Sequence, residues 1–338
     1  MEGNLIVDRR LLKLLLTARE SMVLCLPDSK GGAMGVLSDK EQSYVITAEN
    51  EPISQLLIDL VEAGCLNTLD LSDFDPHMIS LRRKLNPFLL KVKEVGDLKK
   101  AEHLLKLTVH KGVNDFVARF IHPPLEFALT RVLTCKKITP NQVTLTWIFL
   151  AAVVTLLFFH GHVLLGAALA ALCGILDGVD GKLARLTLRF SQIGDRLDHY
   201  CNTLFDGLWY VALGWYFSRG VWHSIPGKLA LLLFVSYGVE RIVPGLFKKI
   251  HGREIYDYSR LDELVRLVGS RMNNNIWLML IAAIFGLEKS AFYTISVWMF
   301  LTAFYHTGRL IWITWFNKNK LLKKSKLSKW KPKEMSKI

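Results

Sequence analysis

Acidic residues set between apolar runs are the part of this sequence most able to do chemistry. Residues 177–202 read DGVDGKLARLTLRFSQIGDRLDHYCN, and the apolar runs on either side are long enough to enter a bilayer. A carboxylate at that depth costs several kcal/mol unless it is paired, solvated or bound to a metal ion. Asp177, Asp180, Asp195 and Asp198 are therefore candidate functional residues.

The spacing of these residues predicts two polar helix faces. Asp177 and Asp180 are three positions apart, and Gly194, Asp198 and Asn202 repeat every four positions on a second helix. If the two faces meet, their oxygens converge on a small volume, as they do where a hard divalent cation such as Mg²⁺ is held beside a phosphate. The spacing therefore favours a metal and phosphate site between two helices.

Three further residues suit a phosphate ligand. Gly181 and Ala184 continue the first polar face and would let a ligand approach the backbone, and Arg185 offers a fixed positive fork. A competing interpretation is a structural ion-pair network, although charges without a function are rare at this depth. The arginines available for such a network are Arg185, Arg189 and Arg196. Asp195 lies off the face of Asp198 and could simply pair with an arginine at the helix start.

Composition indicates how these helices are placed. The chain has 338 residues, is 51% hydrophobic and carries a formal net charge of +13. Its long apolar runs begin only after about residue 142, and a bilayer needs approximately 20 apolar residues per helix. The fold class predicted is a multi-span α-helical membrane protein with a small N-terminal α/β cytoplasmic domain. The six predicted transmembrane helices cover roughly residues 143–160, 162–184, 195–217, 226–247, 274–288 and 290–316.

Basic residues predict the orientation. Lys248, Lys249, the loop at 251–271 and the tail at 317–338 fall on one side, while the opposite loops carry few positive charges. By the positive-inside rule this side is cytoplasmic, so both termini and the active site are expected on the cytoplasmic face of the cell membrane. The basic tail is also expected to lie on anionic lipids. No recognition motif accompanies the charge, so nucleic-acid binding is not expected.

The segments before the first span predict a separate domain and a linker. Residues 1–108 alternate short apolar runs with amphipathic helices, which suggests a small α/β domain, and GGAMG at 31–35 resembles a hairpin turn more than a phosphate loop. Residues 109–141 mix apolar and basic positions, as an interfacial amphipathic helix would. Pro123 and Pro124 should break or kink that helix. The spans would then occupy 142–316, followed by the tail at 317–338.

The sequence at 177–202 resembles the signature of the CDP-alcohol phosphotransferases, which is DxxDGxxAR, eight residues, then GxxxDxxxD. Its fixed residues are matched by Asp177, Asp180, Gly181, Ala184, Arg185, Gly194 and Asp198, while the last Asp is replaced by Asn202. KGVNDFVARFI and KKITPNQVTL also look like the interfacial helix and first span of the branch that makes di-inositol phosphate phosphodiesters. Residues 1–108 resemble a truncated nucleotidyltransferase domain that lacks its Gly-rich start.

The resemblance implies a metal-dependent membrane transferase that moves a substituted phosphate from a CDP-linked alcohol to an acceptor alcohol and releases CMP. The implied metal ligands, for Mg²⁺ or Mn²⁺, are Asp177, Asp180, Asp198 and Asn202. Gly181, Ala184 and Arg185 would line the cytidine and phosphate pocket, and Asn141, otherwise a helix cap, would reach the nucleotide. The implied donor is CDP-diacylglycerol or a CDP-inositol-like molecule, and the acceptor is an alcohol or an inositol phosphate. Membrane lipids and a second copy of the chain are the other expected partners.

Asn202 leaves the chemistry open, because an amide cannot take a proton near neutral pH. The catalytic pair Asp198 and Asn202 could be assisted by His199 or Asp206, or the acceptor could need no protein base. Alternatively, the chain is a catalytically silent member that binds CDP-alcohols or scaffolds a partner. For Asp206 a hydrogen bond inside the bundle is the favoured interpretation. Arg241 could pair with a neighbouring helix or bind an acceptor phosphate, and Arg309 near His306 is expected to be structural.

Overall fold

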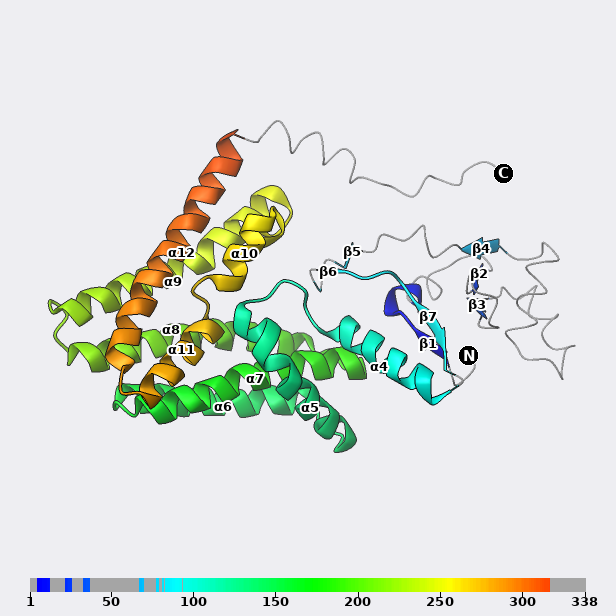
Figure 1. The fold of residues 1–338 in the computed structure, drawn as a ribbon, viewed down its shortest axis with the longest axis horizontal. Helices are drawn as coiled ribbons and strands as arrows, with labels where there is room; N and C mark the ends of the chain where they lie inside the picture. Colours follow the sequence, from blue (N-terminus) through cyan, green and yellow to red (C-terminus); the bar gives the residue numbers. More distant parts are fainter. Residues whose placement is uncertain are drawn as a thin grey trace, which may run out of the picture. The chain divides into compact units, whose positions relative to one another are not determined.

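The computed structural model describes residues 5–12, 22–25, 33–36, 67–69, 77–78, 81, 83–92 and 94–316. The chain divides into two compact units, Met1–Gly112 and Val113–Ile338 (Figure 1). The predicted basic tail at 317–338 lies outside the described residues. Of the hairpin turn predicted at 31–35, residues 31 and 32 also lie outside them, whereas residues 33–35 belong to a strand, β3.

Short strands, a short helical stretch at residues 9–12 and the helix α4 make up the described part of the first unit. β1 (Leu5–Val7) pairs antiparallel with β7 (Leu89–Lys91), and β5 (His77–Met78) pairs antiparallel with β6 (Arg83–Lys84). A three-stranded sheet has the order β3-β2-β4, in which the central strand β2 pairs antiparallel with β3 and parallel with β4. The bounds of its strands are Met22–Cys25 for β2, Ala33–Val36 for β3 and Asn67–Leu69 for β4. α4 (Val95–Val109) then ends the unit.

The second unit is helical throughout its described length. A π-helical turn, η3 (Val117–Ile121), leads into α5 (His122–Cys135), so the two prolines at 123 and 124 lie in the first turn of a helix, where a missing N–H is harmless. The helices that follow are α6 (Pro140–Phe159), α7 (Val163–Thr187), α8 (Gln192–Ser218), α9 (Ile225–His251), η4 (Ile255–Asp257), α10 (Arg260–Val268), α11 (Met272–Ile284) and α12 (Glu288–Phe316).

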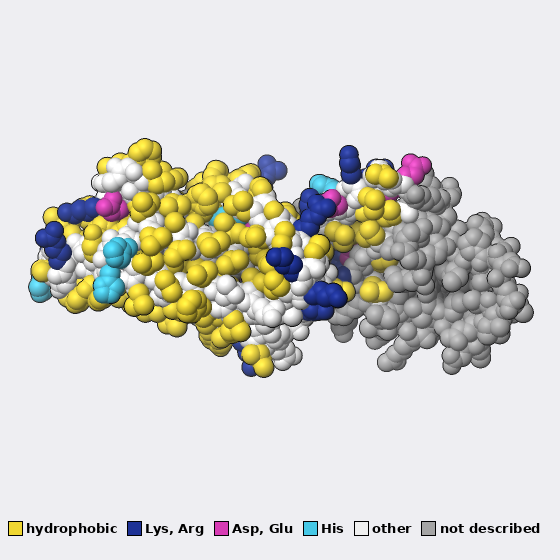
Figure 2. Space-filling view, turned by 90° about the horizontal axis from the view of Figure 1, so that it is seen from below, with side chains coloured by type: hydrophobic (Ala, Val, Ile, Leu, Met, Phe, Trp, Pro, Cys, Tyr) yellow, Lys and Arg dark blue, Asp and Glu magenta, His cyan; other side chains and the backbone are white. Residues whose placement is uncertain are grey.

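Six of these helices lie where the sequence predicts spans, and three meet a criterion of length and apolarity for crossing a membrane. Those three are α6, α7 and α9. α8 and α12 have the length but not the apolarity, and α11 has 13 residues, fewer than the approximately 20 that a crossing requires. Hydrophobic side chains cover much of the surface of the helical unit in Figure 2. One of the exposed hydrophobic residues of this unit is Phe149, which is 70% exposed. A surface this apolar suits lipid rather than water.

Close helix contacts form the core of the helical unit. α6 packs along α7 and α8, and α9 packs along α12 (Figure 1). Small residues on α7, among them Ala167 and Ala170, allow α6 to approach, and Trp147, Phe158 and Trp209 fill the space between these helices. In lipid, where burial of apolar surface drives little association, small residues and packed side chains are the usual source of helix adhesion.

Asp262 joins the short helix α10 to the long helix α12. Its carboxylate is fully buried and accepts hydrogen bonds from Arg309 Nε at 2.7 Å, Tyr305 Oη at 2.8 Å and Ser259 Oγ at 2.6 Å. Burial opposes ionisation of this group, but the hydrogen bonds from Arg309 and its neighbours outweigh burial and hold the pKa of Asp262 below its ordinary value. Arg309 is therefore structural, as the sequence predicts.

Replacing Asp262 by asparagine should lower the free energy of unfolding by about 3 kcal/mol, because it leaves the Arg309 charge without its buried partner. The stability that the ionised carboxylate contributes is present above its ordinary pKa and is lost as the pH falls through the lowered pKa, so the variant should also lose that acid dependence. Thermal unfolding in detergent at several pH values measures both effects. Glu263→Gln removes a neighbouring, partly exposed carboxylate whose ion pair with Arg119 is open to solvent, and it should change stability by less than about 1 kcal/mol. Equal effects of the two substitutions would contradict this role for Asp262.

Candidate active site

Three carboxylates meet where α7 and α8 come together. Asp177, Asp180 and Asp198 each offer one oxygen, and these oxygens all lie within 4.8 Å of one another. α7 supplies the first two residues and α8 supplies the third. Asp180 is buried, whereas Asp177 and Asp198 are partly exposed. The structure thus brings together three of the four aspartates that the sequence singles out, and Asp195 is not in the cluster.

A tight reversal between the two helices creates this meeting. α7 ends at Leu188, which adopts a left-handed conformation with φ of 56°. Three residues later Ser191 begins α8 by accepting a hydrogen bond from the backbone N–H of Gly194 at 3.1 Å. Across this short connection, Asp177 and Asp180 of α7 and Asp198 of α8 bring their carboxylates into one volume.

Asp180 is oriented by the neighbouring helix α6. Its Oδ2 accepts a hydrogen bond from Thr144 Oγ1 at 2.7 Å and another from the Trp147 ring N–H at 3.2 Å. Thr144 and Trp147 are themselves buried. Two donors on one oxygen fix the rotamer of the carboxylate. The sequence pattern gave no role to either donor.

Asn202 lies directly against the carboxylate cluster. Its side-chain N–H donates to Asp177 Oδ1 at 2.6 Å and to Asp198 Oδ1 at 3.2 Å. The amide thus connects α7 to α8 at the position where an aspartate would add a fourth negative charge. The two residues considered as substitutes lie elsewhere: His199 is exposed, and Asp206 forms an ion pair with Arg241 of α9.

A cavity of about 330 Å³ opens beside the cluster. Its lining includes the predicted residues Asn141, Asp180, Gly181, Ala184 and Asp198, together with residues of the α7–α8 connection. The remaining lining residues are Pro140, Thr144, Arg189, Phe190, Ser191, Gln192, Gly194 and Asp195. The cavity is therefore polar on the side of the carboxylates and includes one aromatic ring, that of Phe190.

Two predicted residues have particular positions around this cavity. Asn141 is not the helix cap, because Thr139 caps α6 by accepting from the Gln142 backbone N–H. Instead its side-chain oxygen faces Gly194, where any side chain at residue 194 would collide with it. Arg185 folds back over Gly181, since a Cβ there would lie 3.2 Å from its guanidinium. Gly181 and Gly194 thus leave room that other residue types would fill.

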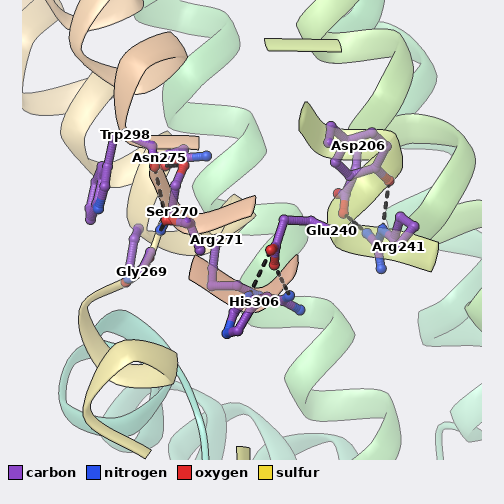
Figure 3. Close-up of polar contacts among 12 residues, drawn as sticks. Asp206, Glu240, Arg241, Gly269, Ser270, Arg271, Asn275, Trp298 and His306 are labelled. Carbon is purple, nitrogen blue, oxygen red and sulfur yellow. Dashed lines mark hydrogen bonds and ion pairs between the residues drawn. The ribbon is translucent and has the colours of Figure 1, made fainter. Parts of the chain in front are cut away.

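A second polar cluster lies deeper in the bundle (Figure 3). Asp206 and Arg241 form one ion pair, which bears out the structural interpretation of Asp206. Glu240 joins two further residues: its Oε1 lies 2.7 Å from His306 Nδ1, and its Oε2 lies 4.0 Å from Arg271 Nη1. Arg271 gave no signal in the sequence, because it lies in a loop between apolar runs.

Comparisons with known proteins find the same kind of relative in the family models and among the curated proteins. Residues 137–250 match the family model described as CDP-alcohol phosphatidyltransferase. A bifunctional IPC transferase and DIPP synthase of Thermococcus kodakarensis is 30% identical over 208 residues, which are 60% of this chain and 46% of that protein. A phosphatidylinositol phosphate synthase of Corynebacterium glutamicum is 36% identical over 81 residues, which are 24% of this chain and 37% of that protein.

The extent of these matches is limited. The chain spans about half the length of the first curated relatives, at 46%, 47% and 58% of their sequences. Among solved structures, the phosphatidylinositol phosphate synthase of Mycobacterium tuberculosis with CDP-DAG bound covers 56% of this chain and 94% of its own, with 17% identity and a TM-score of 0.43.

Proposed function

Because the chain belongs, through residues 137–250, to the CDP-alcohol phosphatidyltransferase family, we propose that it is a membrane transferase of phospholipid synthesis. It moves a substituted phosphate from a CDP-linked alcohol to an acceptor alcohol and releases CMP. The observation that carries this proposal is the cluster of Asp177, Asp180 and Asp198 at the edge of a cavity large enough to take part of a nucleotide.

The donor occupies the cavity between α6, α7 and α8 in this proposal. Gly181, Ala184 and Gly194 let the nucleotide approach the backbone, and Asn141 lies where its amide can reach the nucleotide. Arg185 supplies positive charge for the phosphates. CDP-diacylglycerol and a CDP-inositol-like molecule share this CDP group, so both are candidate donors, with an alcohol or an inositol phosphate as acceptor.

The carboxylate cluster has the donor set of a magnesium or manganese site. Oxygens of Asp177, Asp180 and Asp198 lie close enough to share one cation, and hard divalent cations prefer such ligands. When bound, the cation would neutralise charge on the departing phosphate of CMP. Thr144 and Trp147 hold Asp180 in place, and Asn202 can rotate its amide to present an oxygen instead of its N–H groups.

The proposed membrane arrangement has six spans, formed by α6, α7, α8, α9, α11 and α12. The burial of polar pairs between α9 and α12 supports inclusion of the less apolar helices, since such pairs are stable within a bundle. The site opens on the cytoplasmic side of the cell membrane, where both termini also lie. Residues 1–108 form the proposed nucleotidyltransferase-like domain and 109–141 the interfacial linker.

A second candidate function follows from Asn202. The chain would bind CDP-alcohols without turning them over, or would scaffold a partner, because the amide lacks the basicity of an aspartate. The contacts of Asn202 with both Asp177 and Asp198 are the observation that favours this alternative.

Binding can be tested before turnover. Purified chain in lipid nanodiscs is titrated by calorimetry with CDP-diacylglycerol in the nanodisc or with CMP in solution, each with and without Mn²⁺. The proposal expects saturable nucleotide binding that tightens when Mn²⁺ is present. Absence of binding to both the nucleotide and the cation would contradict the transferase and also the silent chain that binds CDP-alcohols.

Removing the hydroxyl that orients Asp180 should weaken the reaction. Thr144→Val deletes a buried hydrogen bond of 2.7 Å and is expected to lower CMP release by about 10- to 100-fold, the range for groups that orient metal ligands. Thr146→Val is the matched control on the same helix, because the Thr146 hydroxyl is exposed and bonds only to the backbone oxygen of Gln142. Equal activity of the two variants would exclude this orienting role.

A further inference from the structure

A buried ion pair connects the interfacial helix α5 to the helix that carries the site. The Lys182 ammonium donates to the carboxylate of Glu126, and each residue is only 3–4% exposed. Lys182 belongs to α7 and lies two positions after Asp180. The aromatic ring of Phe127 also lies near the ammonium, with its centroid 5.4 Å away. No role in the proposed reaction accounts for this pair.

α7 presents different residues to each of its neighbours. Asp180 bonds to α6 and Asp177 bonds to Asn202 of α8. Gly174, Gly178 and Lys182, spaced by four, lie along a third face, and this face meets α5. Lys182 therefore points toward Glu126 and away from the three clustered aspartates, although in the sequence it lies between Asp180 and Asp198.

Gly178 makes the room that Glu126 occupies. A Cβ at residue 178 would collide with the Glu126 carboxylate, and one at Gly174 would come within 3.3 Å of the His122 ring. His122 in turn accepts a hydrogen bond from the Trp277 ring N–H at 3.0 Å, so α5 is also fixed to α11. The carboxylate of Glu126 is therefore held at one place against α7.

The charge of Lys182 acts on the carboxylate site. Lys182 lies on the same turns of α7 as Asp177, Asp180 and Arg185, five residues or fewer from each, so these charges lie within electrostatic range of one another. A lysine ammonium is a compact charge on a flexible stem. If Glu126 lost its charge, the nearest anions available to Lys182 would be those of the site, and an uncompensated positive charge would oppose a cation bound there.

We propose that Glu126 is a positioning residue that binds the Lys182 ammonium on the α5 side of α7 and so keeps this charge from competing with a divalent cation for Asp177 and its neighbours. This inference rests on the proposed metal site. It assigns a role in the chemistry to a helix outside the spans, through one buried carboxylate.

The test is Mn²⁺ affinity, measured by electron paramagnetic resonance on the full chain in nanodiscs, together with CMP release. Glu126→Gln should weaken Mn²⁺ binding by about tenfold or more, since 1.4 kcal/mol of repulsion suffices for that factor. Lys182→Met alone should leave the affinity within about threefold. The double variant Glu126→Gln/Lys182→Met should recover it, because the competing charge is gone. Glu263→Gln, which removes a partly exposed carboxylate, is the control and should bind as the unmutated chain does.

A purely structural role predicts a different pattern, in which the double variant binds Mn²⁺ no better than Glu126→Gln. That result, or unchanged affinity in a folded Glu126→Gln variant, would overturn the inference. Failure of the unmutated chain to bind Mn²⁺ would instead contradict the proposed metal site itself. If Glu126→Gln is not recovered folded, Glu126→Asp withdraws the carboxylate by one methylene, and the same rescue by Lys182→Met is expected of it.

Discussion

Replacing Asp198 by alanine is expected to lower CMP release from a CDP-alcohol by more than about 100-fold. Groups that merely orient a metal ligand already cost about 10- to 100-fold when removed, and Asp198 is a proposed ligand itself. Its carboxylate is the contribution of α8 to a cluster whose other members come from α7. The measurement is a coupled or chromatographic assay of CMP with purified chain in nanodiscs.

Asp195→Asn is the matched control for that substitution. Asp195 lies on the same helix and lines the same cavity, but it is exposed and is not one of the three clustered carboxylates. Its loss should change the rate by less than about threefold, the scale of an exposed charge. Equal losses from the two substitutions would mean that general negative charge, and not the cluster, supports the reaction.

Replacing Asn202 by aspartate is expected to raise the rate of CMP release by about 10²- to 10⁴-fold, the usual contribution of a general base. The side chain already lies at the cluster, 2.6 Å from Asp177 Oδ1 and 3.2 Å from Asp198 Oδ1 through its amide nitrogen. An aspartate of the same shape would therefore need little rearrangement. It would also add a fourth negative charge and tighten the binding of Mn²⁺.

Comparison of CMP release by the unmutated chain and by Asn202→Asp distinguishes the two candidate functions. A slow but measurable rate that Asp198→Ala removes supports the transferase. A rate that appears only in Asn202→Asp supports the silent alternative. If Asn202→Asp changes neither rate nor Mn²⁺ affinity, residue 202 has no part in the reaction, and the position of its amide in the cluster is only structural.

If the unmutated chain is a slow transferase, its limiting step is removal of the proton from the acceptor hydroxyl. Asp206 does not offer a free base, since it is paired with Arg241, and the ring of His199 is exposed on α8. Neither residue contacts the carboxylate cluster in the described structure. An acceptor whose hydroxyl is already acidified would suit such a site, because it requires less help from the protein.

The spacing of acidic residues is enough to predict the carboxylate cluster, because helix periodicity decides which side chains share a face. Asp177, Asp180 and Asp198 therefore come together as expected. Contacts between distant segments could not be predicted from the sequence. The donors to Asp180 are an example, because Thr144 and Trp147 lie more than 30 positions before it and nothing in their local pattern marks them as its partners. Only the capping alternative for Asn141 fails, because Thr139, with Gln142 three positions later, makes the capping box.

Charge pairing explains the remaining differences. Nothing in the sequence marks Glu126 and Lys182 as partners, because they lie 56 positions apart. Only the packing of α5 on α7 buries them together. Membrane crossing was predicted from apolar runs, which identify α6, α7 and α9 clearly. The polar pairs of α8 and α12 lower their apolarity, since Asp206 and His306 find their partners inside the bundle rather than in water.

The central claim is tested most directly by CMP release from defined donors. Unmutated chain in nanodiscs is supplied with CDP-diacylglycerol or CDP-inositol, an alcohol or inositol phosphate acceptor, and Mg²⁺ or Mn²⁺, and CMP and the phosphodiester product are quantified by mass spectrometry. We expect CMP and product in equal amounts with one of these donors, and neither after chelation of the metal with EDTA. Absence of CMP with every donor in the presence of the cation, from protein that is folded and binds the nucleotide, would contradict the proposed transferase.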